Sequence, residues 1–506
     1  MSIDKEENKR RIFKNTFALY LRTAIAMVVS LVVTRILLKE LGEDNYGIYN
    51  VVASVVVLFS FLNASMSQAI QRFITFALGK GNLKRTNEVF STSVITQLLI
   101  TMLLIVICET VGVWFINRWM VIDASRLEAV NWAFQFSILT FAANFLRVPY
   151  ESSIIAYEKM SFFAYATIGD SLIKLAIVYL LAFSPIDKLI FYTQLLFLES
   201  LIMLGIYYLH CRVRFPICRF NWIWDRGLFK EIFLFSGWNV FGSMANIFSQ
   251  KGVVIFLNLF VGIVANAAMG IANQVNSALN SFINSFQTSF RPQIIKAYAA
   301  GENDYLLNMI SATSKFSFIL IYVPAILIVV NTQWILSVWL TEVPEYTVRF
   351  CQLITISCMI DAVTGPYNCA ILATGKIKGY QLALSLSCLL DVTLCYAILK
   401  SGISANYVLY SRILTRGVFN MFIGLYFMNV LLDFKVVEYC RKVIAPILCF
   451  LAFHLPLLIV GTRVYEGRQW FGLSTSYVFV FGTLGALFIL LHKEERRYLF
   501  KLVSRK

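Results

Sequence analysis

Long runs of hydrophobic residues, separated by short polar segments, make up most of this chain between residues 14 and 491. A run of about 20 apolar residues is long enough for one helix to cross a bilayer. The pattern predicts fourteen such helices, near 14–38, 46–70, 89–111, 129–149, 161–183, 189–209, 232–257, 264–290, 316–338, 350–373, 379–399, 406–431, 443–461 and 470–491. The predicted fold class is therefore an all-α polytopic membrane protein.

Lysine and arginine are unevenly distributed between the predicted loops. With the N-terminus inside, the inner segments contain the basic clusters at 5–14, 80–85, 212–230 and 493–506, whereas the outer loops contain few basic residues. Cytoplasmic loops carry such an excess, so the pattern favours an even number of helices with both termini in the cytoplasm. The same bias accounts for most of the net charge of +16, which therefore requires no nucleic-acid partner. We expect a multi-pass protein of the inner (plasma) membrane.

Composition and motifs exclude several chemistries. The chain is 59% hydrophobic and only 14% charged, with a mean hydropathy of +0.72. Its ten cysteines include no C-x-x-C pair, and its three histidines are scattered. It contains no P-loop, no G-x-G-x-x-G motif and no metal-ligand spacing. We therefore expect no cofactor, no bound metal and no ATP hydrolysis within this chain.

An internal repeat divides the chain. Residues 58–63 match residues 279–284 at an offset of 221, and Gly42 aligns with Gly262. Chance similarity between apolar segments is the alternative. A period of six helices preserves orientation and predicts two parallel six-helix lobes about an axis along the membrane normal. We expect an N-terminal lobe at 1–210, a cytoplasmic loop at 211–231, a C-terminal lobe at 232–431, and two additional helices with a basic tail at 432–506.

Positively charged side chains lie inside, or just within the ends of, the predicted membrane helices. A cation in hydrocarbon costs roughly 2.5 to 3.5 kcal/mol on insertion scales, so it persists where it lines water, pairs with an acid or meets an anionic ligand. The six residues concerned are Arg22, Arg35, Lys174, Lys251, Arg412 and Arg416.

Local spacing distinguishes these cations from one another. Lys174 lies four residues from Asp170, and Arg147 four residues from Glu151, so each pair can neutralise itself on one helix face. Arg35 lies near a helix end, where its side chain can reach the headgroups. Arg22 and Lys251 have no acid within one helical turn, which favours a position facing a cavity. Arg412 and Arg416 share a helix face and could pair with Asp391 and Asp361 of neighbouring helices.

The intramembrane carboxylates are candidates for ion coupling. Glu199 is isolated in the middle of its helix and is either a partner for Lys174 or a proton-coupling residue. Coupling to protons and coupling to sodium both remain open. The full candidate set is Glu199, Asp361 and Asp391.

Amide side chains recur at three- and four-residue spacing in the eighth predicted helix and form one polar stripe. Such a stripe can hydrogen-bond sugar hydroxyls, or it can hold helices together within the bilayer. The cationic residues nearby favour glycan contact. The stripe comprises Asn273, Asn276, Asn280, Asn284 and Gln287.

Several short motifs resemble one transporter family. They are Leu41-Gly42 before Tyr46-Gly-Ile-Tyr49, Gln71-Arg72-Phe73 before Gly79-Lys-Gly-Asn82, Arg147-Val-Pro-Tyr150 before Ile155-Ala-Tyr-Glu-Lys-Met160, Phe290-Arg-Pro-Gln293, and Ala373-Thr-Gly-Lys376. The chain is similar to the polysaccharide-exporter branch of the MOP superfamily, which includes the Wzx-type O-antigen flippases.

This resemblance implies a bacterial inner-membrane protein that is not an enzyme. Such proteins move undecaprenyl-pyrophosphate-linked oligosaccharide from the cytoplasmic to the periplasmic leaflet by alternating access through a cationic central cavity, and a glycan polymerase can act downstream. Arg72 and Arg291 lie in the matching motifs and join the six intramembrane cations as candidates for binding the pyrophosphate. The related lipid II flippases have an Arg-Asp pair where this chain reads Ala24-Ile-Ala-Met-Val28, so a polysaccharide repeat unit is the favoured cargo.

Two other functions remain as alternatives. A multidrug cation exporter of the same superfamily would be expected to have an acidic cavity, whereas basic residues are in excess here. A membrane enzyme that modifies glycans would be expected to have a large periplasmic loop, whereas the longest predicted loop is cytoplasmic.

Overall fold

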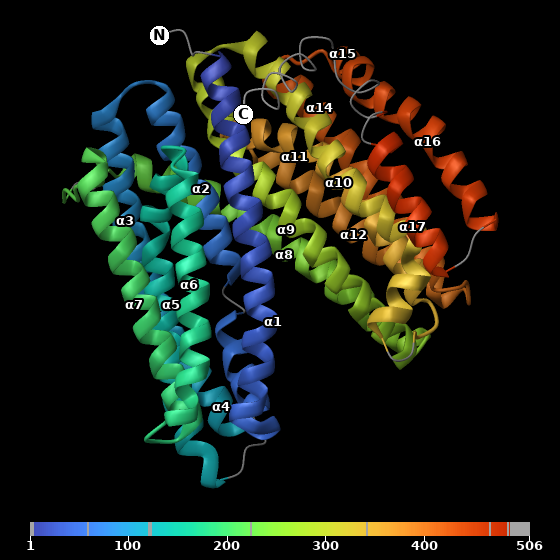
Figure 1. Ribbon diagram of the computed structural model, residues 1–506. Coiled ribbons are helices and arrows are strands. Elements are labelled where there is room, and N and C mark those ends of the chain that lie inside the picture. Colours follow the sequence, from blue (N-terminus) through green and yellow to red (C-terminus); the bar gives the residue numbers. More distant parts are fainter. Residues whose placement is uncertain are drawn as a thin grey trace. The chain divides into compact units, whose positions relative to one another are not determined.

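The structure is a computed structural model that describes residues 5–57, 60–119, 124–222, 225–340, 343–464, 467–482 and 485. Every regular element in these ranges is a helix (Figure 1). The α-helices up to residue 260 are α1 (Lys5–Val57), α2 (Ser60–Gly79), α3 (Leu83–Ile107), α4 (Val113–Trp119), α5 (Leu127–Ala156), α6 (Met160–Leu180), α7 (Lys188–Arg214) and α8 (Arg226–Phe260). Those that follow are α9 (Ile263–Ala300), α10 (Asn303–Trp339), α11 (Thr347–Thr374), α12 (Lys378–Lys400), α13 (Asn406–Arg412), α14 (Asn420–Leu432), α15 (Val436–Tyr439), α16 (Ala445–Val464) and α17 (Gly467–Tyr477).

Short 3-10 and π-helical segments connect or extend these helices. The 3-10 segments are η2 (Ala124–Arg126), η3 (Leu181–Phe183) and η4 (Pro216–Cys218), and the π-helical segments are η1 (Cys108–Gly112), η5 (Ile413–Phe419), η6 (Cys440–Ile444) and η7 (Val478–Gly482). A π-helical turn is wider than an α-helical turn and is often found at functional sites. The segment η5 joins α13 to α14 and contains Arg416.

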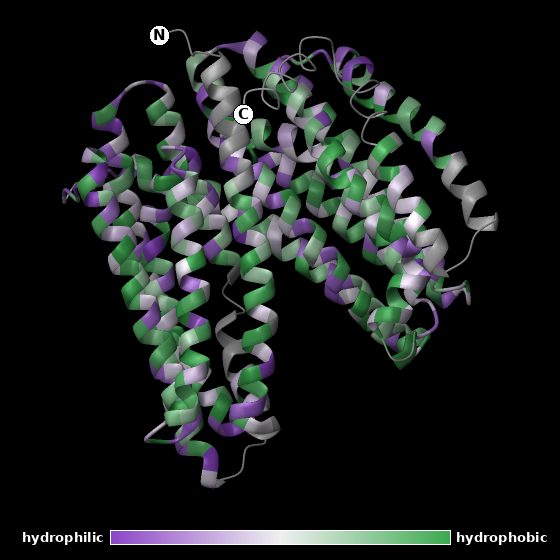
Figure 2. Cartoon of the chain, viewed as in Figure 1, coloured by the Kyte–Doolittle hydropathy of each residue, from purple (hydrophilic) through white to green (hydrophobic). Residues whose placement is uncertain are grey.

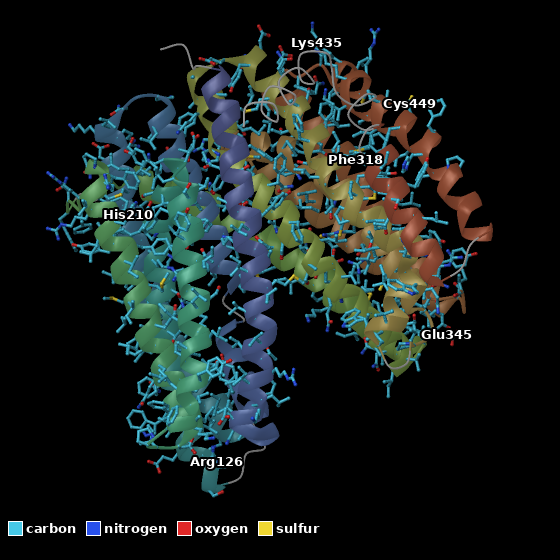
Figure 3. All side chains as sticks on the ribbon, in the orientation of Figure 1. Arg126, His210, Phe318, Glu345, Lys435 and Cys449 are labelled. Atoms are coloured by element: carbon cyan, nitrogen blue, oxygen red, sulfur yellow. The ribbon has the colours of Figure 1, made fainter. Side chains whose placement is uncertain are left out.

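The chain divides into two compact units, and the division falls inside α8 between Val240 and Phe241. The first unit extends from Arg11 to Val240, and the second contains the chain from Phe241 onward. His210 and Arg126 lie at opposite ends of the first unit, and Lys435 and Glu345 at opposite ends of the second (Figure 3).

Ten helical stretches in the described ranges are long and apolar enough to cross a membrane. Hydrophobic residues extend along the helices, and hydrophilic residues are more frequent at the helix ends and turns (Figure 2). The predicted helix at 264–290 lies within α9 but is not one of the ten, because its amides and hydroxyls lower its hydropathy. The protein is an all-α, multi-pass membrane protein, as the sequence predicts.

Backbone geometry supports the internal repeat. Gly42 has φ 77° and ψ 169°, and Gly262 has φ 105° and ψ −171°, so the two aligned glycines share an unusual conformation. The turns that follow α2 and α9 also match, because Gly81 and Gly301 have φ of 68° and 74°. Gly81 and Gly301 are 220 residues apart, as are Gly42 and Gly262, whereas residues 58–63 match residues 279–284 at an offset of 221.

Helix packing repeats in the same order in the two units. In the first unit α5 packs against α2, α3 and α7, and α6 packs against α7. In the second unit α11 packs against α9, α10 and α14, and α12 packs against α13 and α14. Equivalent neighbours at equivalent places along the chain are what a duplicated six-helix unit produces.

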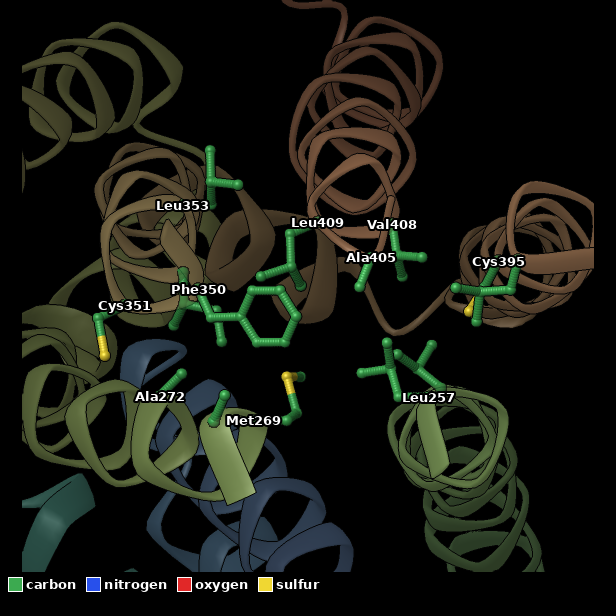
Figure 4. Packing of buried hydrophobic residues seen from close by; sticks show 14 of the residues in the cluster. Leu257, Met269, Ala272, Phe350, Cys351, Leu353, Cys395, Ala405, Val408 and Leu409 are labelled. Carbon is green, nitrogen blue, oxygen red and sulfur yellow. The ribbon is translucent and has the colours of Figure 1, made fainter. Parts of the chain in front are cut away.

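Each unit has its own apolar core. In the second unit Leu257, Met269, Phe350, Cys395 and Leu409 come from five helices and meet in one buried cluster (Figure 4). In the first unit a cluster fixes α1 against α6 and α7, the helices that carry Arg22, Lys174 and Glu199. Its members are Leu37, Leu41, Ile177, Val178, Leu181 and Tyr192.

Replacing Gly42 by Ala is expected to destabilise the first unit by about 1 to 3 kcal/mol, because its φ and ψ fall in a region that only glycine adopts readily. The same change at Gly262 should have a similar effect. The midpoint of thermal unfolding in detergent measures both. Gly205→Ala in α7 is the control, since an added Cβ there meets nothing within 4 Å and alanine favours a helix. Equal midpoints for all three variants would contradict the conformational requirement.

Candidate functional site

Arg22 lies on α1 inside the first unit and has an incompletely satisfied guanidinium group. Its Nε is buried and has no hydrogen-bond partner among the described residues. Its Cζ lies 5.0 Å from the centroid of the Phe163 ring on α6. Glu151 of α5 interacts with it electrostatically. The sequence expectation that Arg22 has no local acid is correct along its own helix, but the fold supplies one from α5.

Arg147 and Glu151 form an ion pair on α5, as their spacing predicts. The distance from Arg147 Nε to Glu151 Oε2 is 3.8 Å, and the guanidinium group lies over the ring of Tyr207 on α7, 5.3 Å from its centroid. Because Glu151 also interacts with Arg22, this pair is not self-contained. It joins α1, α5 and α7.

A second group of charges connects α6 and α7. Lys174 Nζ donates to Asp170 Oδ2 at 2.8 Å, which is the expected pair along one helix. The carboxyl groups of Asp170 and Glu199 lie close enough to interact with each other. Glu199 is only 3% exposed. Two neighbouring carboxyl groups can hydrogen-bond to each other only when one of them carries a proton, so this pair is a candidate site for proton uptake.

The first unit therefore contains one network of three cations and three carboxyl groups from four helices. Electrostatic interactions of Arg147 with Asp170 and Glu199 connect its two halves. The sequence analysis treated most of these residues as separate local pairs, because spacing detects only neighbours on one helix. The members are Arg22, Arg147, Glu151, Asp170, Lys174 and Glu199.

Arg35 lies outside this network. It is exposed and lies on the same helix as Arg22, thirteen residues further along, or roughly 20 Å at 1.5 Å per residue. This position fits the alternative in which its side chain reaches the headgroup region.

In the second unit Asp391 and Arg412 bind each other. Asp391 is fully buried, and Arg412 Nε lies 3.4 Å from its Oδ2. Ser249 Oγ of α8 donates to Oδ2 at 2.6 Å, and Thr415 Oγ1 of η5 donates to Oδ1 at 3.1 Å. The carboxylate thus connects α8, α12, α13 and η5. The Asp391 carboxylate therefore offsets the charge of Arg412, and each of its two oxygens has a partner.

Arg416 differs from Arg412, although only four residues separate them. Its guanidinium group contacts the thiol of Cys388 on α12 and interacts electrostatically with Asp361 on α11. Asp361 is exposed, whereas Asp391 is buried. The Ser387 hydroxyl of α12 donates to the Thr415 carbonyl of η5 at 3.1 Å, a hydrogen bond that supports the wide turn of this segment.

Lys251 is exposed on α8, next to Gln250, whose amide donates to Asn246 Oδ1 at 2.8 Å. Lys251 belongs to the second unit and Arg22 to the first. Arg72 packs over the rings of Phe73, Phe76 and Phe235 at 4.6, 4.8 and 5.9 Å.

The residues of the polar stripe lie on two sides of α9, one packed against α11 and one exposed. Asn280 Nδ2 donates to Asn276 Oδ1 at 2.8 Å, and the Cys358 thiol of α11 donates to the same oxygen at 2.9 Å, so these two asparagines connect helices. Asn284 lies on the exposed face. That face also presents Gln274, which the sequence analysis did not place in the stripe, and Ser277 and Ser281, which it missed because it considered no hydroxyls.

Gln287 lies against α11, with its amide where a side chain at Gly365 would be. A Cβ added to Gly365 would lie 1.8 Å from Gln287 Nε2. Asn273 is half-buried. Arg291, the remaining candidate of α9, accepts a weak hydrogen bond at its carbonyl from Cys369 Sγ at 3.9 Å.

The described residues contain no group of three or more His, Cys, Asp or Glu side chains arranged to hold a metal. The polar groups of the site are instead guanidinium, ammonium, carboxyl and amide groups inside helical bundles. Buried cations in a bundle either pair with acids or bind anionic ligands, and two neighbouring carboxyl groups can take up or release a proton. Charged and amide groups inside membrane helices are typical of helical membrane transporters.

The chain belongs to the family described as "Polysaccharide biosynthesis protein", whose model matches residues 12–297. One relative is the protein "Uncharacterized membrane protein EpsK" of Bacillus subtilis (strain 168), which is 22% identical over 326 residues. That match spans 62% of this chain and 63% of the relative, so the chain covers less than two thirds of the relative's length.

Solved structures show that the fold is that of MOP-superfamily transporters. A MATE transporter in complex with MaD3S has a TM-score of 0.72 at 10% identity and is matched over 86% of this chain and 97% of its own. A MOP-superfamily transporter from Pyrococcus furiosus, with a binding pocket described as of reverse polarity, has a TM-score of 0.71 at 10% identity, over 86% of this chain and 100% of its own. An outward-facing MATE transporter has a TM-score of 0.70 at 10% identity, over 87% of this chain and 100% of its own.

Proposed function

We propose that this protein is a flippase that moves undecaprenyl-pyrophosphate-linked oligosaccharide, an O-antigen, capsule or exopolysaccharide repeat unit, from the cytoplasmic to the periplasmic leaflet by alternating access. The family supports a role in polysaccharide biosynthesis, and the fold supports transport. The observation that carries the proposal is the guanidinium group of Arg22, which is half-buried and has an unsatisfied Nε. Such a group provides charge and hydrogen-bond donors for a pyrophosphate.

The polar face of α9 supports an oligosaccharide as cargo. Ser277 donates to the Asn273 carbonyl at 2.9 Å, and Ser281 donates to the Ser277 carbonyl at 2.8 Å. Each hydroxyl oxygen on this face can still accept a hydrogen bond, and the amides of Gln274 and Asn284 can donate as well as accept. A row of mixed donors and acceptors suits sugar hydroxyls, which also do both.

Reconstitution into vesicles tests the proposal. Purified protein should transfer fluorescent undecaprenyl-pyrophosphate-linked oligosaccharide between leaflets, as measured by its protection from a reagent outside, and should leave the lipid chemically unchanged. Empty vesicles provide the background rate. Transport of lipophilic cations without transport of the oligosaccharide would support the multidrug alternative, and conversion of the lipid to another product would support an enzyme.

Reporter fusions are expected to place the loop from Arg212 to Lys230 in the cytoplasm and the loop around Glu345 outside. This expectation follows from the excess of basic residues in the first loop. A reporter active only in the cytoplasm and one active only in the periplasm measure the two positions. Placement of both loops on the same side would mean that the number of helices between them is even, contrary to the three helices that the fourteen-helix prediction places there.

Proton coupling through Asp170 and Glu199 accompanies the proposed flippase activity. Movement of a proton onto this pair would weaken the hold of Asp170 on Lys174, and the freed ammonium group could then bind the phosphate. Glu199→Gln, which cannot take up a proton, is therefore expected to remove the dependence of flipping on a proton gradient. Rates with and without an imposed pH gradient measure the effect.

The control for Glu199→Gln is Glu128→Gln, a change at an exposed carboxylate of the same unit. It should leave the gradient dependence intact. A rate that responds to a sodium gradient and not to a proton gradient would exclude this coupling route and point to Asp361 or another carboxylate.

A further inference from the structure

The segment between α7 and α8 is fixed to the first unit rather than loose. Asn87 of α3 donates through Nδ2 to the carbonyl oxygens of Ile217 and Arg219, at 2.7 and 2.8 Å. The backbone N–H of Asn221 donates to Ser91 Oγ at 3.2 Å, and its amide donates to Asn87 Oδ1 at 2.9 Å. Four hydrogen bonds thus hold residues 217–221 against the start of α3.

Asp225 fixes the end of this segment at the start of α8. Its Oδ1 accepts from the Leu228 N–H at 3.0 Å, and its Oδ2 forms an ion pair with Arg85 at 2.8 Å. These two interactions hold the pKa of Asp225 below its usual range. The carboxylate is therefore charged and already occupied at neutral pH, so it does not compete for external cations.

The side chains of the segment that point outward are basic and aromatic. Phe220 is 44% exposed and Trp222 is 79% exposed, and their ring centroids are 6.1 Å apart in an edge-to-face arrangement. Arg219 beside them is exposed, as are Arg212 and Arg214 at the end of α7. We call Arg212, Arg214, Arg219, Phe220 and Trp222 the aromatic-basic surface.

The position of this surface in the chain indicates what covers it. It lies between α7 and α8, two helices long and apolar enough to cross the membrane, so it is at the level where those helices leave the bilayer. Tryptophan and phenylalanine rings with arginines beside them suit the headgroup layer, because the rings enter the interface and the guanidinium groups bind phosphate. A soluble protein partner would have to displace that lipid.

We propose that the aromatic-basic surface binds the headgroups of anionic phospholipids, with Trp222 inserted at the interface and Arg212, Arg214 and Arg219 on lipid phosphates. The hydrogen bonds from Asn87 and the ion pair of Asp225 with Arg85 hold the surface in a fixed position against α3 and the start of α8. The inference is independent of the cargo.

Quenching of Trp222 by brominated lipid tests this inference in the full-length protein. The emission assigned to Trp222 is the difference between the wild type and Trp222→Phe, measured in nanodiscs. Brominated phosphatidylglycerol is expected to quench it at least about threefold more than brominated phosphatidylcholine with the same chains, and high salt should reduce the difference. Arg212→Gln/Arg214→Gln/Arg219→Gln should remove most of the headgroup preference.

The matched control changes three basic residues at the other helix ends, Arg118→Gln/Arg349→Gln/Lys400→Gln, and should keep the preference. Asn87→Ala should weaken it without removing any charge, because the segment is then released from α3. Equal quenching by the two lipids, or an undiminished preference in the triple variant of the surface, would overturn the proposal. Emission from Trp222 that neither lipid quenches would mean that the surface faces water or a protein instead. Size-exclusion profiles confirm that each variant is folded.

Discussion

Replacing Arg22 by Gln is expected to reduce flipping of lipid-linked oligosaccharide at least about tenfold, because hydrogen bonds between charged groups contribute ~1.5 to 3 kcal/mol each. Gln retains hydrogen bonding but leaves the pyrophosphate charge uncompensated in a medium of low dielectric constant. Arg22→Lys should retain part of the activity, since it keeps the charge but loses the planar arrangement of donors. The vesicle assay measures the three rates.

The neighbouring acid makes this experiment decisive. If Arg22 only neutralises Glu151, then Arg22→Gln/Glu151→Gln should recover the wild-type rate, because no unpaired carboxylate is left and Arg147 keeps its interactions with Asp170 and Glu199. If Arg22 binds the cargo, the double variant should stay slow. Arg35→Gln is the control, since Arg35 is exposed on the same helix. A Gln variant as active as the Lys variant would show that Arg22 is not an anion-binding residue.

Replacing Asp391 by Asn is expected to destabilise the second unit by about 3 to 5 kcal/mol, because Arg412 is left as a nearly buried, unpaired cation. Asn has almost the same shape as Asp, so the loss arises from charge rather than packing. The midpoint of thermal unfolding in detergent, with the protein matched for bound lipid, measures the effect.

Asp361→Asn is the control for Asp391→Asn, because Asp361 is exposed and should tolerate the change. In Asp391→Leu/Arg412→Met both charges are removed, and we expect most of the stability to return. A stable Asp391→Asn protein that no longer responds to an ion gradient would instead favour ion coupling at Asp391.

The order of hydrophobic and polar residues along the chain was sufficient to predict the fold class. Runs of about 20 apolar residues have few options in a bilayer other than helices, because every backbone N–H and C=O must be bonded within the segment. The glycines at 42 and 262 were visible as a repeat, and the structure shows that both have the same positive-φ geometry. Helix ends were less predictable. The predicted helix at 316–338 is longer in the structure and begins at Asn303, because its first turns are helical although they are too polar for a hydropathy pattern to include them.

The candidate site was only partly predictable, and the reason differs between residues. The pair of Lys174 with Asp170 follows from four-residue spacing, and the structure confirms it. The pair of Arg412 with Asp391 was one option among neighbouring helices, and the structure confirms that option too. For the amide stripe, periodicity identified the helix but could not determine which side packs against α11. Only the contacts of Asn276 with Cys358 showed that part of the stripe connects helices.

Length, hydropathy and one-turn spacing are local properties of the sequence, and they were enough to predict a helical membrane protein with charged residues inside its spans. The contacts of Arg22 with Glu151, of Asp170 with Glu199, and of residues 217–221 with Asn87 become visible only once the chain is folded. These contacts join segments separated by roughly 30 to 130 positions, and hydrogen bonds and ion pairs act over only a few ångströms, so helix packing must bring the partners together before they can form.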